Sequence, residues 1–142
     1  MPHAVPSTRA YDAITATNGS TYYSHPAQGV ASTVASAGTA MPYSHDVGLC
    51  LRTGAGCAGT LSVQVSCGSD QAIADGSAIW MDYDRLYAAG SSTAATSLAI
   101  VASTDYPIGL ECMMFGRVRL KFACTGTGTL TAEMTVKPRG QG

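Results

Sequence analysis

Residues 118–136 read VRLKFACTGTGTLTAEMTV, and an earlier stretch, residues 49–67, reads LCLRTGAGCAGTLSVQVSC. In both stretches large apolar residues occupy every second position on the two sides of a loop rich in Gly and Thr. Alternation with a period of two is typical of a β-strand that turns one face to a core. The two stretches therefore predict four strands, arranged as two hairpins of one design, and they favour a β-fold.

The two stretches also resemble each other when they are aligned without a gap. The identical positions are Leu51/Leu120, Gly59/Gly128, Thr60/Thr129 and Leu61/Leu130. Two hairpins at matching positions of two sheets would produce this internal repeat. Chance similarity between two loops rich in Gly and Thr is the alternative.

Weaker strand candidates lie at 78–83, 97–102 and 109–115, separated by the Gly, Ser and Asp clusters that are typical of turns. We expect about seven or eight short strands between residues 46 and 138. The predicted fold class is all-β, an antiparallel β-sandwich of jelly-roll or immunoglobulin-like type. Residues 139–142 are expected to form a short tail.

Residues 1–45 follow neither a helical nor a strand pattern and contain few large aliphatic residues. Such a segment buries too little apolar area by itself to offset its chain entropy. We therefore expect an extended N-terminal arm that becomes ordered on a neighbouring subunit; a solvated tail is the alternative. Four tyrosines would anchor this arm on its partner: Tyr11, Tyr22, Tyr23 and Tyr43.

The composition excludes several classes of protein. The chain has 142 residues, a formal net charge of −1 and 12% charged residues, about half of the usual share of roughly 25%. This balance argues against a nucleic-acid-binding protein that works through a concentrated basic surface. No apolar run approaches the roughly 18 residues of a membrane helix. The first residues lack a signal-peptide pattern, so we expect use without secretion.

The sequence offers no strong catalytic, metal or cofactor motif. Residues 54–59 match G-x-G-x-x-G, but a strand pattern follows where a dinucleotide site needs a helix. Asp82 and Asp84 would share one face of a strand, which suits calcium binding or acid–base chemistry, although solvated edge carboxylates have the same spacing. The five cysteines include no Cys-x-x-Cys pair and are expected to be reduced and structural. We predict a protein without enzymatic activity, catalytic residues, metal or cofactor.

Two surface features suggest binding. Arg117, Arg119 and Lys121 are predicted to project from one face of one strand, and Arg52 would join them from the first copy of the repeat. This row suits ion pairs with an acidic protein partner; a solvated sheet face is the alternative. Trp80, with tyrosines at positions 83, 87 and 106, suggests either a sugar-stacking platform or an aromatic core residue.

The order of these motifs resembles that of small β-sandwich virion proteins of tailed bacteriophages, of the head decoration or cement type. The resemblance covers roughly residues 47–137. It is carried by VGLCLR at 47–52, GTLSVQV at 59–65, the Trp-x-Asp step at 80–82, GRVRL at 116–120 and GTLT at 128–131. The turn at 71–77 is more apolar than is usual in the family, and residues 1–45 are not part of the pattern.

The resemblance implies a structural protein of the virion, assembled in the host cytoplasm, that binds between capsomers and stabilises the mature head. Its partner would be the major capsid protein, and it would form a trimer or dimer without binding nucleic acid or membrane. Deletion of residues 1–40 is expected to leave a folded sandwich that binds particles weakly. Two alternatives stay open: a neck, tail or fibre-attachment protein, and a carbohydrate-binding β-sandwich module.

Overall fold

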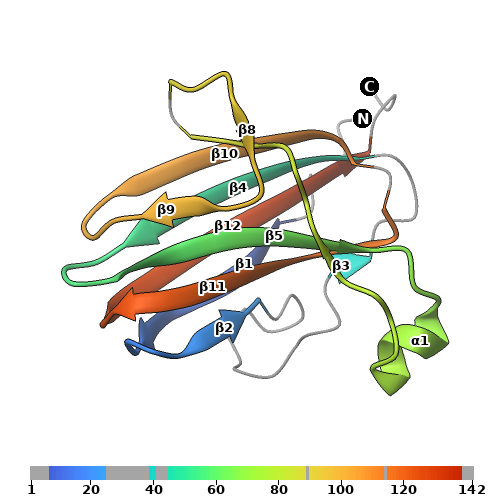
Figure 1. Cartoon of the computed structure of the whole chain (residues 1–142), viewed down its shortest axis with the longest axis horizontal. Helices are drawn as coiled ribbons and strands as arrows, with labels where there is room; N and C mark the ends of the chain where they lie inside the picture. Colours follow the sequence, from blue (N-terminus) through green and yellow to red (C-terminus); the bar gives the residue numbers. More distant parts are fainter. Residues whose placement is uncertain (1–6, 25–38, 41–44, 89, 114, 139–142) are drawn as a thin grey trace.

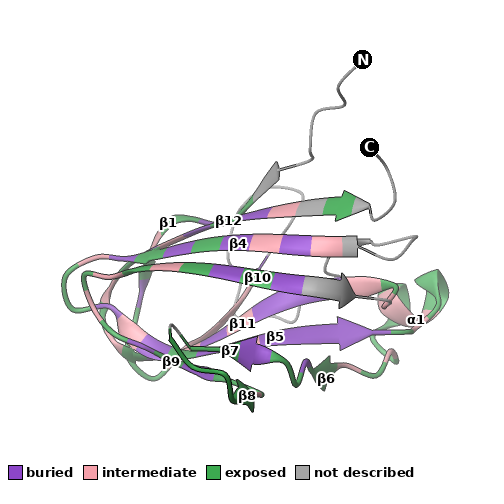
Figure 2. Cartoon of the chain, turned by 90° about the horizontal axis from the view of Figure 1, so that it is seen from above, coloured by how far each residue is buried: buried purple, intermediate pink, exposed green. Residues whose placement is uncertain are grey.

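The computed structural model describes residues 7–24, 39–40, 45–88, 90–113 and 115–138. Antiparallel sheets pack face to face in a sandwich-like arrangement, as the alternating sequence predicted (Figure 1). Seen from above, the two main sheets form separate layers with buried residues between them (Figure 2). The fold is thus mostly β, and the one described helix is short.

Among the described residues, the first sheet has four strands and the second has six. The order of the first is β1 (Ser7–Ala16), β12 (Gly128–Pro138), β4 (His45–Thr53) and β10 (Asp105–Met113). In the second, β11 (Arg117–Gly126) pairs with β5 (Ala58–Ser66). The outer edge of β11 holds β2 (Thr21–Tyr23) and β3 (Thr39–Ala40), and that of β5 holds β6 (Met81–Asp82) and β9 (Leu98–Ile100). A small third sheet pairs β7 (Leu86–Tyr87) with β8 (Ala94–Ala95).

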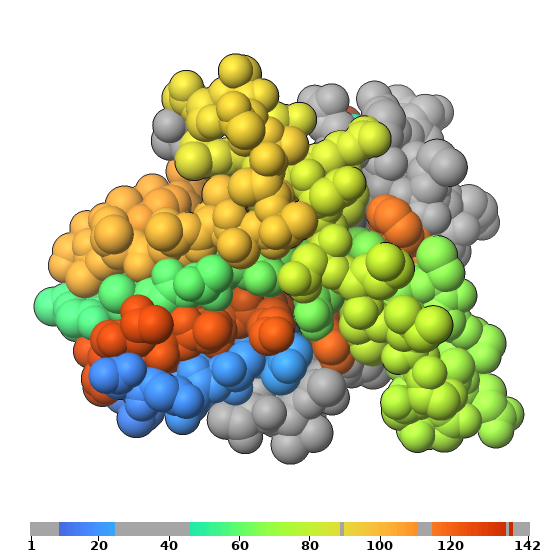
Figure 3. Space-filling view, in the orientation of Figure 1, coloured from blue at the N-terminus to red at the C-terminus, as the bar shows by residue number. Residues whose placement is uncertain are grey.

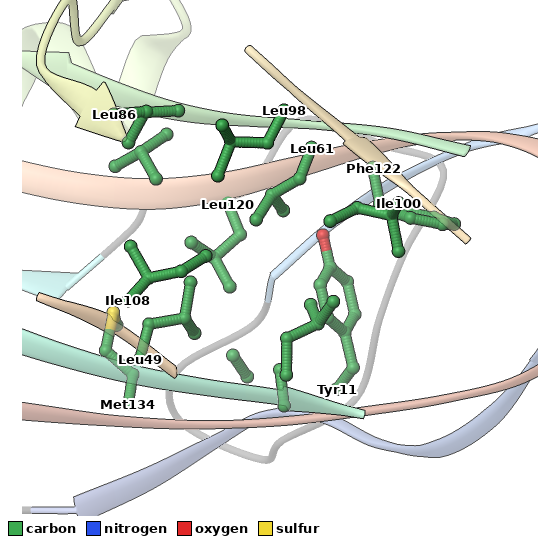
Figure 4. Close-up of a cluster of buried hydrophobic side chains, with 14 of the residues drawn as sticks. Tyr11, Leu49, Leu61, Leu86, Leu98, Ile100, Ile108, Leu120, Phe122 and Met134 are labelled. Atoms are coloured by element: carbon green, nitrogen blue, oxygen red, sulfur yellow. The ribbon is translucent and has the colours of Figure 1, made fainter. Parts of the chain in front are cut away.

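The core lies between the two main sheets and is built from the alternating apolar residues. Leu49, Leu51 and Met134 enter it from the four-stranded sheet, whereas Leu61, Leu120 and Phe122 enter it from the six-stranded sheet (Figure 4). Each fully buried side chain of this size contributes about 1.5–3 kcal/mol through removal from water. The alternation predicted for these strands is therefore confirmed as the source of the core.

The internal repeat has a structural counterpart, but the predicted hairpins are wrong. β4 and β5 are consecutive in sequence yet lie in opposite sheets, and so do β11 and β12. Each loop thus forms an arch between sheets. The pairing runs between the two copies: Leu51 lies opposite Ala132 in one sheet, and the equivalent Leu120 lies opposite Val63 in the other. The two copies thus pair reciprocally, the first strand of each copy with the second strand of the other.

The two arch loops touch each other backbone to backbone. Gly54 donates its amide proton to the Thr129 carbonyl at 2.8 Å. A Cβ on Gly128 would lie 2.5 Å from the Cys57 nitrogen, and one on Gly126 would lie 2.5 Å from the Gly56 carbonyl oxygen. The glycines that match G-x-G-x-x-G therefore allow the two loops to lie in close backbone contact. The strand β5 follows them, where a dinucleotide site would need a helix.

The prediction of an N-terminal arm outside the sandwich is wrong for the residues that the structure describes. β1 forms the edge of the four-stranded sheet against β12, and β2 pairs with β11. Tyr11 has no exposed surface, and its hydroxyl donates a hydrogen bond to the Tyr22 carbonyl at 2.8 Å (Figure 4). The segment thus contributes to the core. The tail expected at 139–142 lies outside the described residues.

The edges of the four-stranded sheet are poorly suited to adding another strand. β1 contains two register shifts, and Ala13 within it has a φ of 49°. Pro107 lies in β10 at the other edge, where its missing N–H interrupts the row of donors. Bulges and edge prolines are common protections against strand-to-strand association. Both edges of this sheet therefore carry features that disfavour pairing with a strand of another protein.

α1 (Asp70–Asp75) is a helix of six residues that the sequence reading treated as a turn. Its ends have ordinary capping signals. The Ser69 hydroxyl accepts a hydrogen bond from the Ala72 amide at 3.1 Å, and Gly76 adopts a left-handed conformation at the C-terminal end. Within the described part of the chain, no helix is long and apolar enough to cross a membrane.

Candidate functional site

The four predicted cationic residues do not share one surface. Arg117, Arg119 and Lys121 alternate with core residues of β11 and therefore lie on the outer side of the six-stranded sheet, as predicted. Arg52 belongs to β4, in the opposite sheet, so its predicted place beside them is wrong. The error follows from the arches, because the two copies of the repeat place equivalent strands in different layers.

Arg119 is held in an aromatic cage and is almost inaccessible to a partner. Only 5% of the residue is exposed, and its guanidinium carbon lies 4.0 Å from the centroid of the Trp80 ring and 4.6 Å from that of Tyr23. Its Nε donates to the Gln64 side-chain oxygen at 2.9 Å, and the Gln64 amide nitrogen donates to Asp82 at 3.0 Å. Burial lowers the pKa of the Arg119 guanidinium. The cage fastens the segment after α1 to the sheet.

The remaining arginines of the predicted row form ion pairs within the chain. Arg117 contacts Asp70 of α1 at 3.2 Å. Arg52 makes two hydrogen bonds to Asp105, at 2.7 and 2.9 Å, which hold the pKa of that carboxyl below its ordinary value. The Arg52 pair is exposed on the other sheet. Of the predicted row, Arg52 and Arg117 are therefore already paired with carboxylates of the same chain, and Arg119 is buried.

The tyrosines proposed as anchors have separate roles in the fold. Tyr11 is buried in the core, so its assignment to a partner surface is wrong, and burial raises its pKa well above the ordinary value. Tyr22 is half-buried, and its hydroxyl accepts a hydrogen bond from the Thr17 amide at 2.9 Å. Tyr23 belongs to the cage around Arg119. Tyr43 lies outside the described residues.

The aromatic residues considered for sugar stacking are not displayed together. Trp80 stacks on Arg119, and Tyr83 is buried against Phe115 with the ring centroids 6.3 Å apart. The Tyr106 hydroxyl accepts a hydrogen bond from the Val101 amide at 2.8 Å. A sugar platform needs aromatic faces that are open to solvent side by side. This arrangement does not favour one.

An apolar groove of about 630 Å³ lies beside the end of β5. α1 and the chain from Ser77 to Asp84 border it; this part of the chain is yellow-green in Figure 3, where α1 projects at the lower right. Val65, Tyr83 and Phe115 supply buried or half-buried apolar surface, and Cys67 also lines the groove. We call this feature the β5–α1 groove.

Two large apolar side chains at the β5–α1 groove are open to solvent. Ile79 is 75% exposed and Met81 is 66% exposed. Both line the groove, and in the sequence they stand on either side of Trp80, which stacks on Arg119. Large apolar residues that gather around a hollow on a folded protein mark a binding surface more often than scattered ones do.

The segment that borders the groove is fixed at both ends. The Ala78 amide donates to the Ala72 carbonyl at 3.0 Å, and the Tyr83 amide donates to the Val63 carbonyl of β5 at 2.7 Å. Between these points Trp80 is held by the cage. The groove is therefore preformed, with its apolar side chains presented on a supported segment, which reduces the entropy cost of binding.

The rim of the groove is acidic. Asp70, Asp75, Asp82 and Asp84 occur between residues 67 and 84, and this stretch contains no Lys, Arg or His. Hydrogen bonds from Ser77 hold the pKa of Asp75 below its ordinary value. Over the described residues, no group of three or more His, Cys, Asp and Glu side chains gathers as a metal site. The carboxylates that the sequence suggested for calcium or catalysis are thus spread around an apolar hollow.

Sequence reasoning found the components of this groove but missed the groove itself. The stretch 78–83 was predicted as a half-buried strand, whereas only Met81–Asp82 form one and Ile79 and Met81 face solvent. The capping residues Ser69 and Gly76 were available as signals of a helix. Neither signal shows which strand the helix lies beside, so the hollow emerges only from the tertiary structure.

Comparison with models of known protein families, with curated proteins and with solved structures finds no significant match to this chain.

Proposed function

We propose that this chain is a non-enzymatic structural protein of a bacteriophage virion, a cement or decoration protein that binds the major capsid protein and stabilises the mature head. The observation that carries a binding role is the preformed β5–α1 groove with exposed Ile79 and Met81. The assignment to a virion rests on the resemblance of the sequence pattern over residues 47–137. A jelly-roll or immunoglobulin-like relationship of the sandwich is part of the same proposal.

The physical properties of the chain agree with such a role. A protein that binds only the mature lattice stabilises it by mass action, without any chemical step. The low share of charged residues, 12%, agrees with close contact to another protein, because charged residues are depleted at the core of protein interfaces. Assembly around symmetry axes of a shell would favour a trimer or dimer of this chain.

The rival within the same class is a neck, tail or fibre-attachment protein of the virion, for which the groove would serve equally well. The carbohydrate-binding module is less favoured, because Tyr83 is buried and Trp80 is engaged by Arg119. These possibilities differ in how many copies of the chain a particle contains.

The decisive experiment is the copy number of this chain relative to the major shell protein, measured by quantitative mass spectrometry on purified particles. We expect a simple ratio to the shell subunit, as a cement protein requires. A ratio far below that would assign the chain to the neck, tail or fibres. Absence of the chain from particles of a phage that encodes it would overturn the virion proposal.

A further inference from the structure

We infer that the β5–α1 groove binds a segment of a partner protein in which one or two large apolar side chains are flanked by Lys or Arg. This inference deepens the proposed function, because it names the chemistry of the protein that the chain would bind. It rests on three features: the apolar lining, the exposed Ile79 and Met81, and the acidic rim.

The lining determines the apolar part of the partner. Val65, Tyr83 and Phe115 present carbon surface within a hollow of about 630 Å³, and Ile79 and Met81 extend this surface outward. A partner side chain such as Leu or Phe that enters the hollow removes apolar surface from water on both molecules. Methionine at the mouth adapts to side chains of different shape, which suits recognition of a peptide segment.

The rim determines the charge of the flanking residues. Asp82 and Asp84 line the groove, and Asp70 and Asp75 lie on the bordering helix. Three arginines lie near this rim: Arg117 contacts Asp70 at 3.2 Å, the Arg85 Nε lies 3.9 Å from Asp84, and the buried Arg119 is linked to Asp82 through Gln64. The four carboxylates therefore exceed the nearby positive charges. Lys or Arg on a bound segment would complement this excess, whereas Asp or Glu would be repelled.

The same charges disfavour two other occupants. A second copy that used the same face would bring both sets of four carboxylates together across the interface. A membrane surface of anionic lipids would repel the rim for the same reason. A segment whose apolar side chains are flanked by Lys or Arg complements both the apolar lining and the carboxylates of the rim.

The test compares two fluorescently labelled peptides of equal length that carry the same central Leu-Phe-Leu sequence. One has a pair of lysines on each side, and the other has a pair of glutamates. Fluorescence anisotropy with the full-length chain at low ionic strength measures the affinity of each peptide. We expect the lysine peptide to bind at least about tenfold more tightly, and this preference to shrink when salt screens the rim.

Matched variants locate the binding. The double variant Ile79→Ser/Met81→Ser should abolish binding, whereas Val101→Ser, which alters a side chain 57% exposed outside the groove, should leave it unchanged. Asp84→Asn combined with Asp70→Asn should reduce the preference for lysine, and Glu133→Gln on the opposite sheet should not. Thermal unfolding of each variant confirms that it is folded.

Three results would overturn the inference: equal affinity for both peptides, binding that survives the loss of Ile79 and Met81, or concentration-dependent self-association that the same double variant abolishes. Binding of the double variant to particles separates the two proposals. If it binds particles as the parent chain does, the groove inference fails and the virion proposal stands. If the chain is absent from particles but prefers the lysine peptide, the groove inference stands alone.

Discussion

At the scale of single residues, Arg52 and Arg119 show how burial changes the contribution that an arginine side chain makes to stability. Arg52 makes a two-bond ion pair with Asp105, but both side chains are largely exposed to water. Arg119 lies between two aromatic rings and is hydrogen-bonded to Gln64. Water screens the first interaction and hardly reaches the second. The caged arginine is therefore the one on which the fold depends.

Arg119→Lys should lower the free energy of unfolding by about 1–2 kcal/mol, because an ammonium group cannot stack as a plane between two rings while donating to Gln64. Urea denaturation followed by the fluorescence of Trp80, the single tryptophan, measures this change. Arg52→Lys is the matched control and should leave stability nearly unaltered. Equal effects of the two substitutions would contradict a special role of the cage.

The described thiols should fall into two classes of reactivity toward an aromatic disulfide reagent at pH 8. Cys50 and Cys67 are exposed, whereas Cys57 and Cys124 are buried. Burial raises the pKa of the Cys57 thiol, so that it stays protonated at this pH and reacts slowly. Cys50→Ser and Cys67→Ser should each remove one fast reaction from the native chain, and Cys57→Ser should remove none. A fast reaction lost in Cys57→Ser would show that this end of the sandwich opens readily.

At the scale of elements, the glycines of the repeat differ from Gly109 at the sheet edge in how much space their surroundings leave for a side chain. A Cβ on Gly59 would lie 2.4 Å from the Ala123 carbonyl oxygen, and one on Gly128 would lie 2.5 Å from the Cys57 nitrogen, whereas one on Gly109 of β10 meets nothing within 4 Å. Gly59→Ala and Gly128→Ala should each cost about 1–3 kcal/mol. Gly109→Ala should be neutral or stabilise by roughly 0.5–1 kcal/mol. Chemical denaturation of the three variants measures the difference, and equal effects would contradict the close backbone contact.

The long strands were predictable because their alternation is regular. β4, β5, β11 and β12 place an apolar residue inward at every second position, and this pattern is visible without any knowledge of their neighbours. β1 was missed because two register shifts interrupt its period, so that the adjacent residues Ala10 and Tyr11 are both buried. A strand whose inward face is defined by a bulge has no regular period to detect.

At the scale of the whole molecule, the sequence showed the repeat but not the partners of its strands. Strand–loop–strand has the same local pattern whether the loop turns back within one sheet or crosses to the other. The choice depends on contacts between residues that are far apart in the chain, such as Leu51 with Ala132. The candidate site could not be predicted for the same reason, because α1, β5 and the segment after α1 form a groove only through their tertiary arrangement.

Removal of residues 1–17 should destabilise the sandwich by more than about 3 kcal/mol, which contradicts the expectation that the N-terminal region can be deleted without loss of folding. The deletion removes one of the two neighbours of β12 and empties the space of the fully buried Tyr11. Tyr11→Ala in the full chain should cost about 3–5 kcal/mol. Tyr87→Ala, at an exposed tyrosine, is the control for the substitution. Thermal and urea unfolding measure all three; an unchanged midpoint after the deletion would show that β1 is dispensable.

The position of β12 has a consequence for how the chain matures in the cell. β12 lies between β1 and β4, although β1 comes first and β12 comes last among the described strands. During translation, at roughly 5–20 residues per second, β1 has no strand partner within its sheet until β12 has been synthesised. β4 can meet β10 earlier, but Leu49 and Leu51 remain uncovered by Met134 and Ala132. The four-stranded sheet therefore cannot be completed before β12 has been made, and until then these leucines lack the neighbours that β12 supplies.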